Sequence, residues 1–172
     1  MAAKRKFWWL VLLGISLAYI VLVQFLSQYM IVGIHWKHSK LDWNFGLAWV
    51  AFALTIAVHV ADEARHDFLA TYNPNALAIR RHLHIPVPVF TFRGWLMGLV
   101  SGVSLLLVLS PFALHGVHWI RIVALPLGIL VGIVNAFIHI GGSLLYRRWM
   151  AGILSSPLLL LAGGWLLWSS QR

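Results

Sequence analysis

Apolar residues fill five long runs of this chain, and most of the charged residues lie in the shorter segments between them. The runs cover residues 7–32, 44–62, 94–114, 119–146 and 151–168. A helix needs about 20 apolar residues to cross the ~30 Å hydrocarbon layer of a membrane, and each run is close to that length. The pattern predicts an all-α membrane protein, in which residues 1–172 form a single integral membrane domain built as a bundle of five transmembrane helices.

The basic residues predict how this bundle is oriented, because segments rich in Lys and Arg stay on the cytoplasmic side. With the N-terminus in the cytoplasm, nine basic residues lie inside: Lys4, Arg5, Lys6, Arg65, Arg80, Arg81, Arg93, Arg147 and Arg148. Four lie outside: Lys37, Lys40, Arg121 and Arg172. We therefore expect a multi-pass protein with a cytoplasmic N-terminus and an outer C-terminus.

The segment between the second and third runs, residues 63–93, is predicted to be an inner loop. Asn73-Pro74 predicts a turn, because the residue before a proline avoids the helical region. Asn75 can then cap a short helix over residues 76–81, apolar on one side and basic at its end. We expect this short helix to lie on the membrane surface.

Composition supports the membrane interpretation and removes several other classes of function. Hydrophobic residues make up 61% of the chain, which is too apolar for an ordinary soluble domain. The net charge of +9 would suggest nucleic acid in a soluble protein, but here topology and contact with anionic lipid account for it, so no nucleic-acid partner is expected. The absence of cysteine excludes disulfides and thiolate metal ligands.

Three of the four acidic residues fall within six positions at the end of the second run. On a helix, His59, Asp62, Glu63 and His66 stand at i, i+3, i+4 and i+7, so their side chains share one face. This arrangement suits either a metal site or an acid–base pair. The Glu63–His66 spacing also matches the Glu-x-x-His pattern of di-iron helices. Ionisable groups are costly at membrane depth, which favours a functional role.

A second polar pair, Asn135 and His139, lies on one face of the fourth run. Both runs cross the membrane in the same direction in the predicted topology, and this brings the two polar groups to a similar depth on the cytoplasmic side. We therefore expect the second and fourth helices to pack together. His59, Glu63, Asn135 and His139 then form one buried catalytic constellation. The alternative is an interhelical hydrogen bond with no catalytic role.

These residues carry a resemblance to a known family. His59-Val-Ala-Asp62-Glu63, Asn135-Ala-Phe-Ile-His139 and the run from Tyr146 to Gly152 together resemble the HXXEE-domain family of small integral membrane proteins. The resemblance covers residues 45–168, and Asp62 stands where the motif has its first Glu. It implies a polar site at His59, Glu63, Asn135 and His139, but no particular reaction. The His-x-x-x-Glu pair on the second helix is also similar to that of sterol-isomerase-type membrane proteins.

Several functions are open at this point. The first is an enzyme that acts on a lipid or another apolar substrate at the cytoplasmic leaflet. In its metal-dependent form, His59, Asp62, Glu63, His66 and His139 are candidate ligands for a divalent zinc, iron or manganese ion. In its metal-free form, His59 and Glu63 act as an acid–base pair in an isomerase. The remaining alternatives are a small proton-coupled transporter and a structural or assembly protein.

Overall fold

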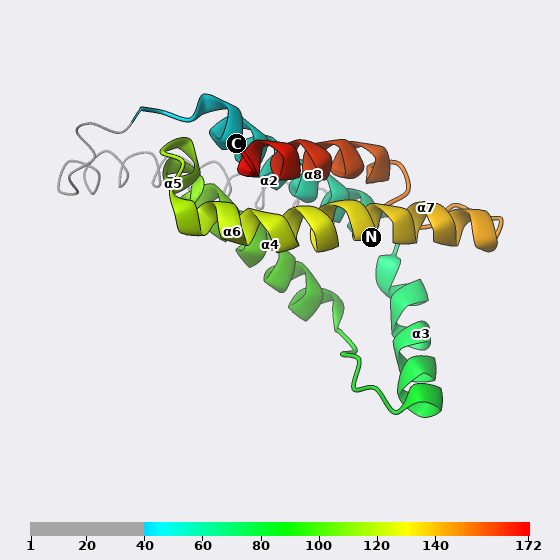
Figure 1. The fold of residues 1–172 in the computed structure, drawn as a ribbon. Coiled ribbons are helices and arrows are strands. Elements are labelled where there is room, and N and C mark those ends of the chain that lie inside the picture. Colours follow the sequence, from blue (N-terminus) through cyan, green and yellow to red (C-terminus); the bar gives the residue numbers. More distant parts are fainter. Residues whose placement is uncertain (1–39) are drawn as a thin grey trace, which may run out of the picture.

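The computed structural model describes residues 40–172, and all regular elements in that part of the chain are helices (Figure 1). In chain order they are α2 (Trp43–Arg65), α3 (Phe68–Leu83), α4 (Phe92–Val108), α5 (Ser110–Leu114), α6 (His118–Pro126), the π-helix η1 (Leu127–Val134), α7 (Asn135–Leu145) and α8 (Ser156–Ser170). The predicted all-α class is confirmed for these residues. The predicted span over residues 7–32 lies outside them.

Helix α2 forms the centre of the fold. It begins at Asp42, whose side chain accepts a hydrogen bond from the Phe45 backbone N–H at 3.1 Å, so that an orphan donor of the first turn is satisfied. The helix continues to Arg65, three residues beyond the predicted span, and so Glu63 lies within it. Its Trp49 side chain is buried and donates from Nε1 to the Leu106 carbonyl of α4 at 2.7 Å.

The fourth predicted run is a continuous helical rod of 28 residues, His118–Leu145, made of α6, η1 and α7. This rod and α2 are the helices within residues 40–172 that are long and apolar enough to cross a membrane. With 17 and 15 residues, α4 and α8 are shorter than the roughly 20 residues that a straight crossing needs. Two helices of spanning length are therefore present in the described part, and the five-span arrangement stays a prediction.

The last helix, α8, packs against both α2 and η1, and these helices lie side by side in Figure 1. Glycines allow a close approach: a Cβ built on Gly132 would lie 2.8 Å from the Gly163 Cα. Helix α8 is therefore a common neighbour of the second and fourth runs. These two runs also meet each other through side chains. The glycines of α4 behave differently, since a Cβ on Gly98 or Gly102 meets nothing within 4 Å in the described part.

The predicted turn at Asn73-Pro74 is wrong, and the short helix predicted over residues 76–81 is part of the longer helix α3. Helix α3 runs through Pro74 and projects away from the bundle (Figure 1). The Asn73 amide donates to the Phe90 carbonyl at 2.9 Å, and its oxygen accepts from the Phe90 N–H at 3.1 Å. Asn75 donates to the Thr71 carbonyl instead of capping a new helix. These bonds outweigh the local preference against a helix before proline.

The third predicted run, residues 94–114, is divided into two helices. Helix α4 ends at Val108, and α5 begins at Ser110 with Pro111 in its first turn. Proline is tolerated in a first turn but not in a helix interior, because its ring collides with the preceding turn and its nitrogen has no proton. The apolar run therefore changes direction here before the chain enters α6.

Candidate metal centre

Side chains from α2 and α7 converge near the last turns of α2. His139 Nε2 lies 3.1 Å from Glu63 Oε1, and His59 Nε2 lies 3.7 Å from the same oxygen. One ligand atom from each of the three residues falls within 4.8 Å of the others. The residues are only 3%, 5% and 2% exposed for His59, Glu63 and His139, so the group is almost closed to solvent. We call His59, Glu63 and His139 the central cluster.

The hydrogen bonds around His59 determine which of its nitrogens carries the proton. Ser155 Oγ lies 2.8 Å from His59 Nδ1 and donates to Asp62 Oδ2, also at 2.8 Å. With the single hydroxyl proton directed to Asp62 Oδ2, or to the Gly152 carbonyl at 3.2 Å, Ser155 Oγ accepts from His59 Nδ1–H. Nε2 of His59 is then unprotonated. A lone pair is therefore directed into the central cluster, which is the form that binds a metal.

Asn135 completes the set of four residues predicted to form the buried site. Its Nδ2 lies 3.1 Å from His59 Nε2, and in the tautomer derived above the amide donates to this lone pair. Asn135 is the first residue of α7 and follows the π-helical segment η1. Short π-helical segments are rare and occur frequently at functional sites. The π-helical turns of η1 determine how α7 is rotated about its axis, and so which way Asn135 and His139 face.

Asp62 and His66, two further predicted ligands, lie beside the central cluster rather than within it. The Asp62 carboxylate accepts from the Ser155 backbone N–H at 3.1 Å as well as from its hydroxyl. Its second oxygen lies 2.8 Å from His66 Nδ1. The His66 side chain is 43% exposed, in contrast with the closed cluster. Asp62 therefore acts on His59 through Ser155, and His66 forms the outer end of this chain of contacts.

His139 holds an unsatisfied polar atom. Its Nδ1 is buried and has no hydrogen-bond partner among residues 40–172. The ring is enclosed by the His59 ring, with centroids 4.8 Å apart, and by Phe68 at 5.8 Å. A buried polar group without a partner costs about 1–3 kcal/mol, so folded proteins contain few of them. This exception lies within the candidate site.

The loop after α7 closes the central cluster from one side. Gly152 has φ +87°, and a Cβ built on it would lie 2.9 Å from His139 Nδ1 and 2.9 Å from His59 Cε1. Only glycine combines this left-handed conformation with such a close approach to both rings. Neither Gly152 nor Ser155 belongs to the predicted site residues. Their positions depend on the chain folding back over 96 residues between Ser155 and His59, and no local spacing indicates that contact.

The donor set fits a divalent transition metal. Catalytic zinc sites use three protein ligands and leave a further position open, and two His with one Glu form one such set. Two histidines with one carboxylate also bind non-haem iron. The oriented lone pair of His59 and the carboxyl oxygens of Glu63 are ligand atoms of the kind that bind a metal when deprotonated. Asp62 and Ser155 supply the outer hydrogen bonds that usually orient a ligating histidine.

Searches of protein-family models, curated proteins and solved structures found no match to this chain. The resemblance to the HXXEE-domain family is therefore untested by comparison. The case for function depends on the geometry of the site.

Proposed function

We propose that this chain is an integral membrane enzyme in which a divalent metal ion, bound by His59, Glu63 and His139, activates water or oxygen toward a lipid or another apolar substrate. One observation carries the proposal: three ligand atoms from two helices lie within 4.8 Å of one another and are shielded from solvent. A bound ion of this kind supplies Lewis acidity and lowers the pKa of a coordinated water.

The cost of burial supports the metal over a purely structural role. A carboxylate without compensation in an apolar interior is strongly unfavourable, and it normally becomes protonated or acquires a partner. An ordinary hydrogen bond between membrane helices contributes only about 0.6–2 kcal/mol, which two neutral side chains could supply. A divalent cation would offset the charge of Glu63 and use the lone pairs of both histidines. Zinc, iron and manganese all suit this set of nitrogen and oxygen ligands.

The membrane setting is part of the same proposal. Helix α2 and the rod His118–Leu145 would cross the bilayer, with the remaining apolar helices completing a multi-pass bundle. The excess of basic residues in the predicted inner segments supports a cytoplasmic N-terminus and an outer C-terminus. The central cluster would then lie on the cytoplasmic side, within reach of lipid-soluble molecules. The HXXEE resemblance supports the same four site residues.

Elemental analysis of the purified full-length protein tests the proposal. We expect about one equivalent of zinc, iron or manganese per chain, retained after dialysis. His139→Ala should lose this metal, because it removes a ligand that is almost fully buried. His66→Ala is the matched control: it removes a neighbouring imidazole that lies outside the central cluster, and the metal content should remain close to that of the wild type.

The proposal fails if the wild-type protein takes up none of these metals when titrated with each under anaerobic conditions. It also fails if His66→Ala and His139→Ala lose metal equally while both remain folded by circular dichroism and size-exclusion chromatography. Equal loss would indicate that the metal binds elsewhere or only through exposed imidazoles.

The Asn135 contact favours a second candidate, a metal-free isomerase that moves a proton. The amide at 3.1 Å from His59 Nε2 covers the lone pair that a metal would use. In this function, His59 and Glu63 would exchange a proton with the substrate, and Asn135 would orient the imidazole. A wild-type protein that binds no metal, but whose proton-exchange activity on an apolar ketone or alkene is lost in Asn135→Ala, would favour this candidate.

A further inference from the structure

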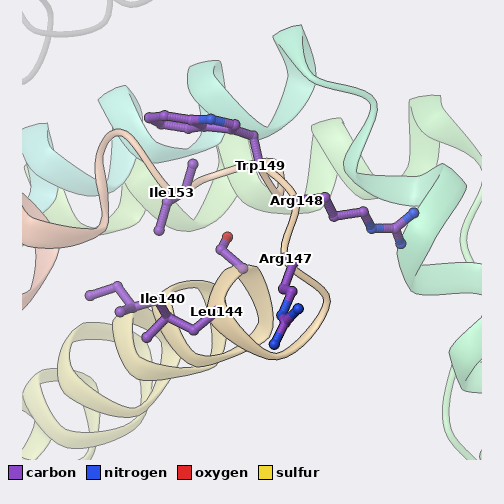
Figure 2. A pocket seen from close by; sticks show the side chains of 7 residues that line it. Ile140, Leu144, Arg147, Arg148, Trp149 and Ile153 are labelled. Atoms are coloured by element: carbon purple, nitrogen blue, oxygen red, sulfur yellow. The ribbon is translucent and has the colours of Figure 1, made fainter.

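A groove lies between the last turns of α7 and the loop that follows this helix. It has a volume of about 310 Å³. Six of the side chains that line it carry the argument: Ile140, Leu144, Arg147, Arg148, Trp149 and Ile153 (Figure 2). We call it the Arg147 groove. Ligand sites in proteins begin at about this size and are mostly apolar, with a few polar groups that fix orientation.

A second hollow of about 360 Å³ continues the Arg147 groove along the loop. The two share Trp149 and Ile153, and the second is also lined by His66 and Met150. His66 contacts Asp62, the residue that orients His59 through Ser155. The combined surface therefore extends from the end of α7 to the outer contacts of the candidate metal centre.

The charged side chains of the groove have no anionic partner in the described part of the chain. Within residues 40–172, neither Arg147 nor Arg148 lies within ion-pair distance of a carboxylate. The Arg148 guanidinium lies 5.6 Å from the Tyr146 ring centre, and in Figure 2 it points away from the Arg147 side chain. Beside these cations, Leu144 and Trp149 are 74% and 78% exposed. Two free cations next to exposed apolar side chains complement a ligand that has a negative head and an apolar tail.

We propose that the Arg147 groove binds an anionic phospholipid, with its phosphate at Arg147 and Arg148 and an acyl chain along Ile140, Leu144 and Ile153. Guanidinium groups pair well with phosphate, and Trp and Tyr are typical of the membrane interface where lipid headgroups lie. The inference rests on the proposed function, because it takes this lipid to be the substrate of the metal centre.

The position of the groove indicates which part of the lipid would meet the metal centre. Leu145 is the last residue of α7, and His139 lies six residues earlier, about 9 Å deeper along the helix axis. Gly152, on which a Cβ would meet both imidazole rings, immediately precedes Ile153 of the groove. A phosphate at the arginines would therefore leave the upper acyl chain, and not the headgroup, nearest to the central cluster.

Native mass spectrometry of the full-length protein in detergent tests this inference and counts the metal in the same spectrum. The probes are phosphatidylglycerol, phosphatidylcholine of the same chain length, and inorganic phosphate. We expect one phosphatidylglycerol to be retained at least about tenfold more tightly than phosphatidylcholine. Changing both Arg147 and Arg148 to Gln should abolish that preference. The double change of Arg80 and Arg81 to Gln removes the same charge from α3 and should leave it intact.

A second pair of variants tests the acyl-chain part of the groove. Leu144→Ser should weaken phosphatidylglycerol binding several-fold, because it removes an apolar wall of the groove. Leu161→Ser is its control, since Leu161 lies on α8 outside the groove and is similarly exposed, at 71% against 74% for Leu144. Equal effects of these two changes would contradict the inference.

The inference is overturned if phosphatidylcholine binds as tightly as phosphatidylglycerol, if both arginine pairs weaken binding equally, or if inorganic phosphate alone shows the same dependence on Arg147 and Arg148. Failure of the proposed function is a separate outcome. The groove variants should keep the metal, and Glu63→Gln should lose the metal while it keeps the lipid. If the protein binds metal but shows no preference for phosphatidylglycerol, only the lipid inference fails. If it prefers phosphatidylglycerol but binds no metal, the proposed metal centre fails.

Discussion

The polar groups at the two ends of helix α2 differ in how completely they are paired. At its start, Asp42 pairs with Arg121, which also donates to the carbonyls of Ser169 at 3.0 Å and Ser170 at 3.3 Å. The Arg121 guanidinium lies 4.7 Å from the centre of the Phe45 ring. The charges of Asp42 and Arg121 and the donors of Arg121 are therefore paired within the protein. These contacts join α2, α6 and the end of α8. Its function is structural.

At the other end, the central cluster is incompletely paired. His59 contacts Ser155 and Asn135, but both imidazoles approach a single oxygen of Glu63, and His139 Nδ1 has no partner in the described part of the chain. Both ends are held by close tertiary contacts, so loose packing does not explain the difference. A buried polar cluster whose hydrogen-bonding groups lack partners therefore indicates a ligand, whereas a cluster whose groups are all paired indicates a structural link.

Glu63→Gln should have the largest effect on metal binding at the end of α2 that carries the central cluster, which we call the functional end. It removes the negative charge and preserves the shape of the side chain, so metal affinity should fall by about 100-fold or more, beyond the 10–100-fold typical of outer-sphere changes. The melting temperature of the metal-free protein should stay the same or rise, because a buried charge is lost. Isothermal titration with zinc and a thermal melt measure both quantities. A large loss of stability with metal affinity unchanged would make this end structural as well.

Gly152→Ala should also disrupt metal binding, through steric contact. A left-handed conformation costs a residue with a Cβ about 1–2 kcal/mol, and here the added carbon would press on both imidazoles. We expect a lower melting temperature together with at least tenfold weaker metal binding. Gly116→Ala is the control that separates backbone strain from pressure on the imidazoles. Gly116 also has a positive φ, +61°, but it lies beside Asp42 and Arg121, at the structural end of α2. That control should lose stability alone, and equal loss of metal affinity in both variants would contradict the assignment.

Ser155→Ala should weaken metal binding by about 10–100-fold, because His59 loses the contact that fixes its tautomer. Ser156→Ala is the control: Ser156 is equally buried and donates to the Gly152 carbonyl at 2.7 Å, but it does not touch His59. Nitrogen-15 NMR of labelled histidine should show His59 protonated at Nδ1 in the wild type and a mixture of tautomers in Ser155→Ala. An unchanged His59 spectrum would exclude this role of Ser155.

Arg121→Met should have the smallest effect at the metal centre and a measurable one on the fold. It keeps the aliphatic stem and leaves Asp42 and two carbonyls without their donor, at a cost of about 2 kcal/mol. For a chain of this size, that corresponds to a fall of roughly 5 °C in melting temperature. Metal affinity should not change. Arg172→Met, which removes an exposed stacked cation, should change neither quantity.

The sequence predicts the central cluster because helical spacing is local. The i, i+4 pairs His59–Glu63 and Asn135–His139 share helix faces in any helix, and the cost of burying them requires that those faces meet. The fold brings all four residues together. The prediction goes no further than the helices. Asp62 and His66 have the same local spacing yet lie beside the cluster, where His66 contacts Asp62 and Asp62 is bonded to Ser155 by contacts that only the folded chain provides.

The remaining differences come from tertiary bonds that outweigh local preferences. Pro74 lies inside α3 because Asn73 is bonded to Phe90, 17 residues along the chain. Helix α8 begins at Ser156, not at residue 151, because residues 152–155 form the loop that closes on the histidines. Gly128 and Gly132 lie in close contact with α8, and this partner cannot be read from their spacing alone.

X-ray absorption spectroscopy of the metal-loaded full-length protein tests the central claim most directly. The account predicts a shell of nitrogen and oxygen ligands, at about 2.0–2.2 Å if the metal is zinc, with the multiple scattering of two imidazoles. His139→Ala should not retain the metal after purification, and when zinc is added back in excess the imidazole contribution should fall to one. A first shell without imidazole scattering, or one that is the same in the wild type and in His139→Ala, would contradict a metal centre formed by His59, Glu63 and His139.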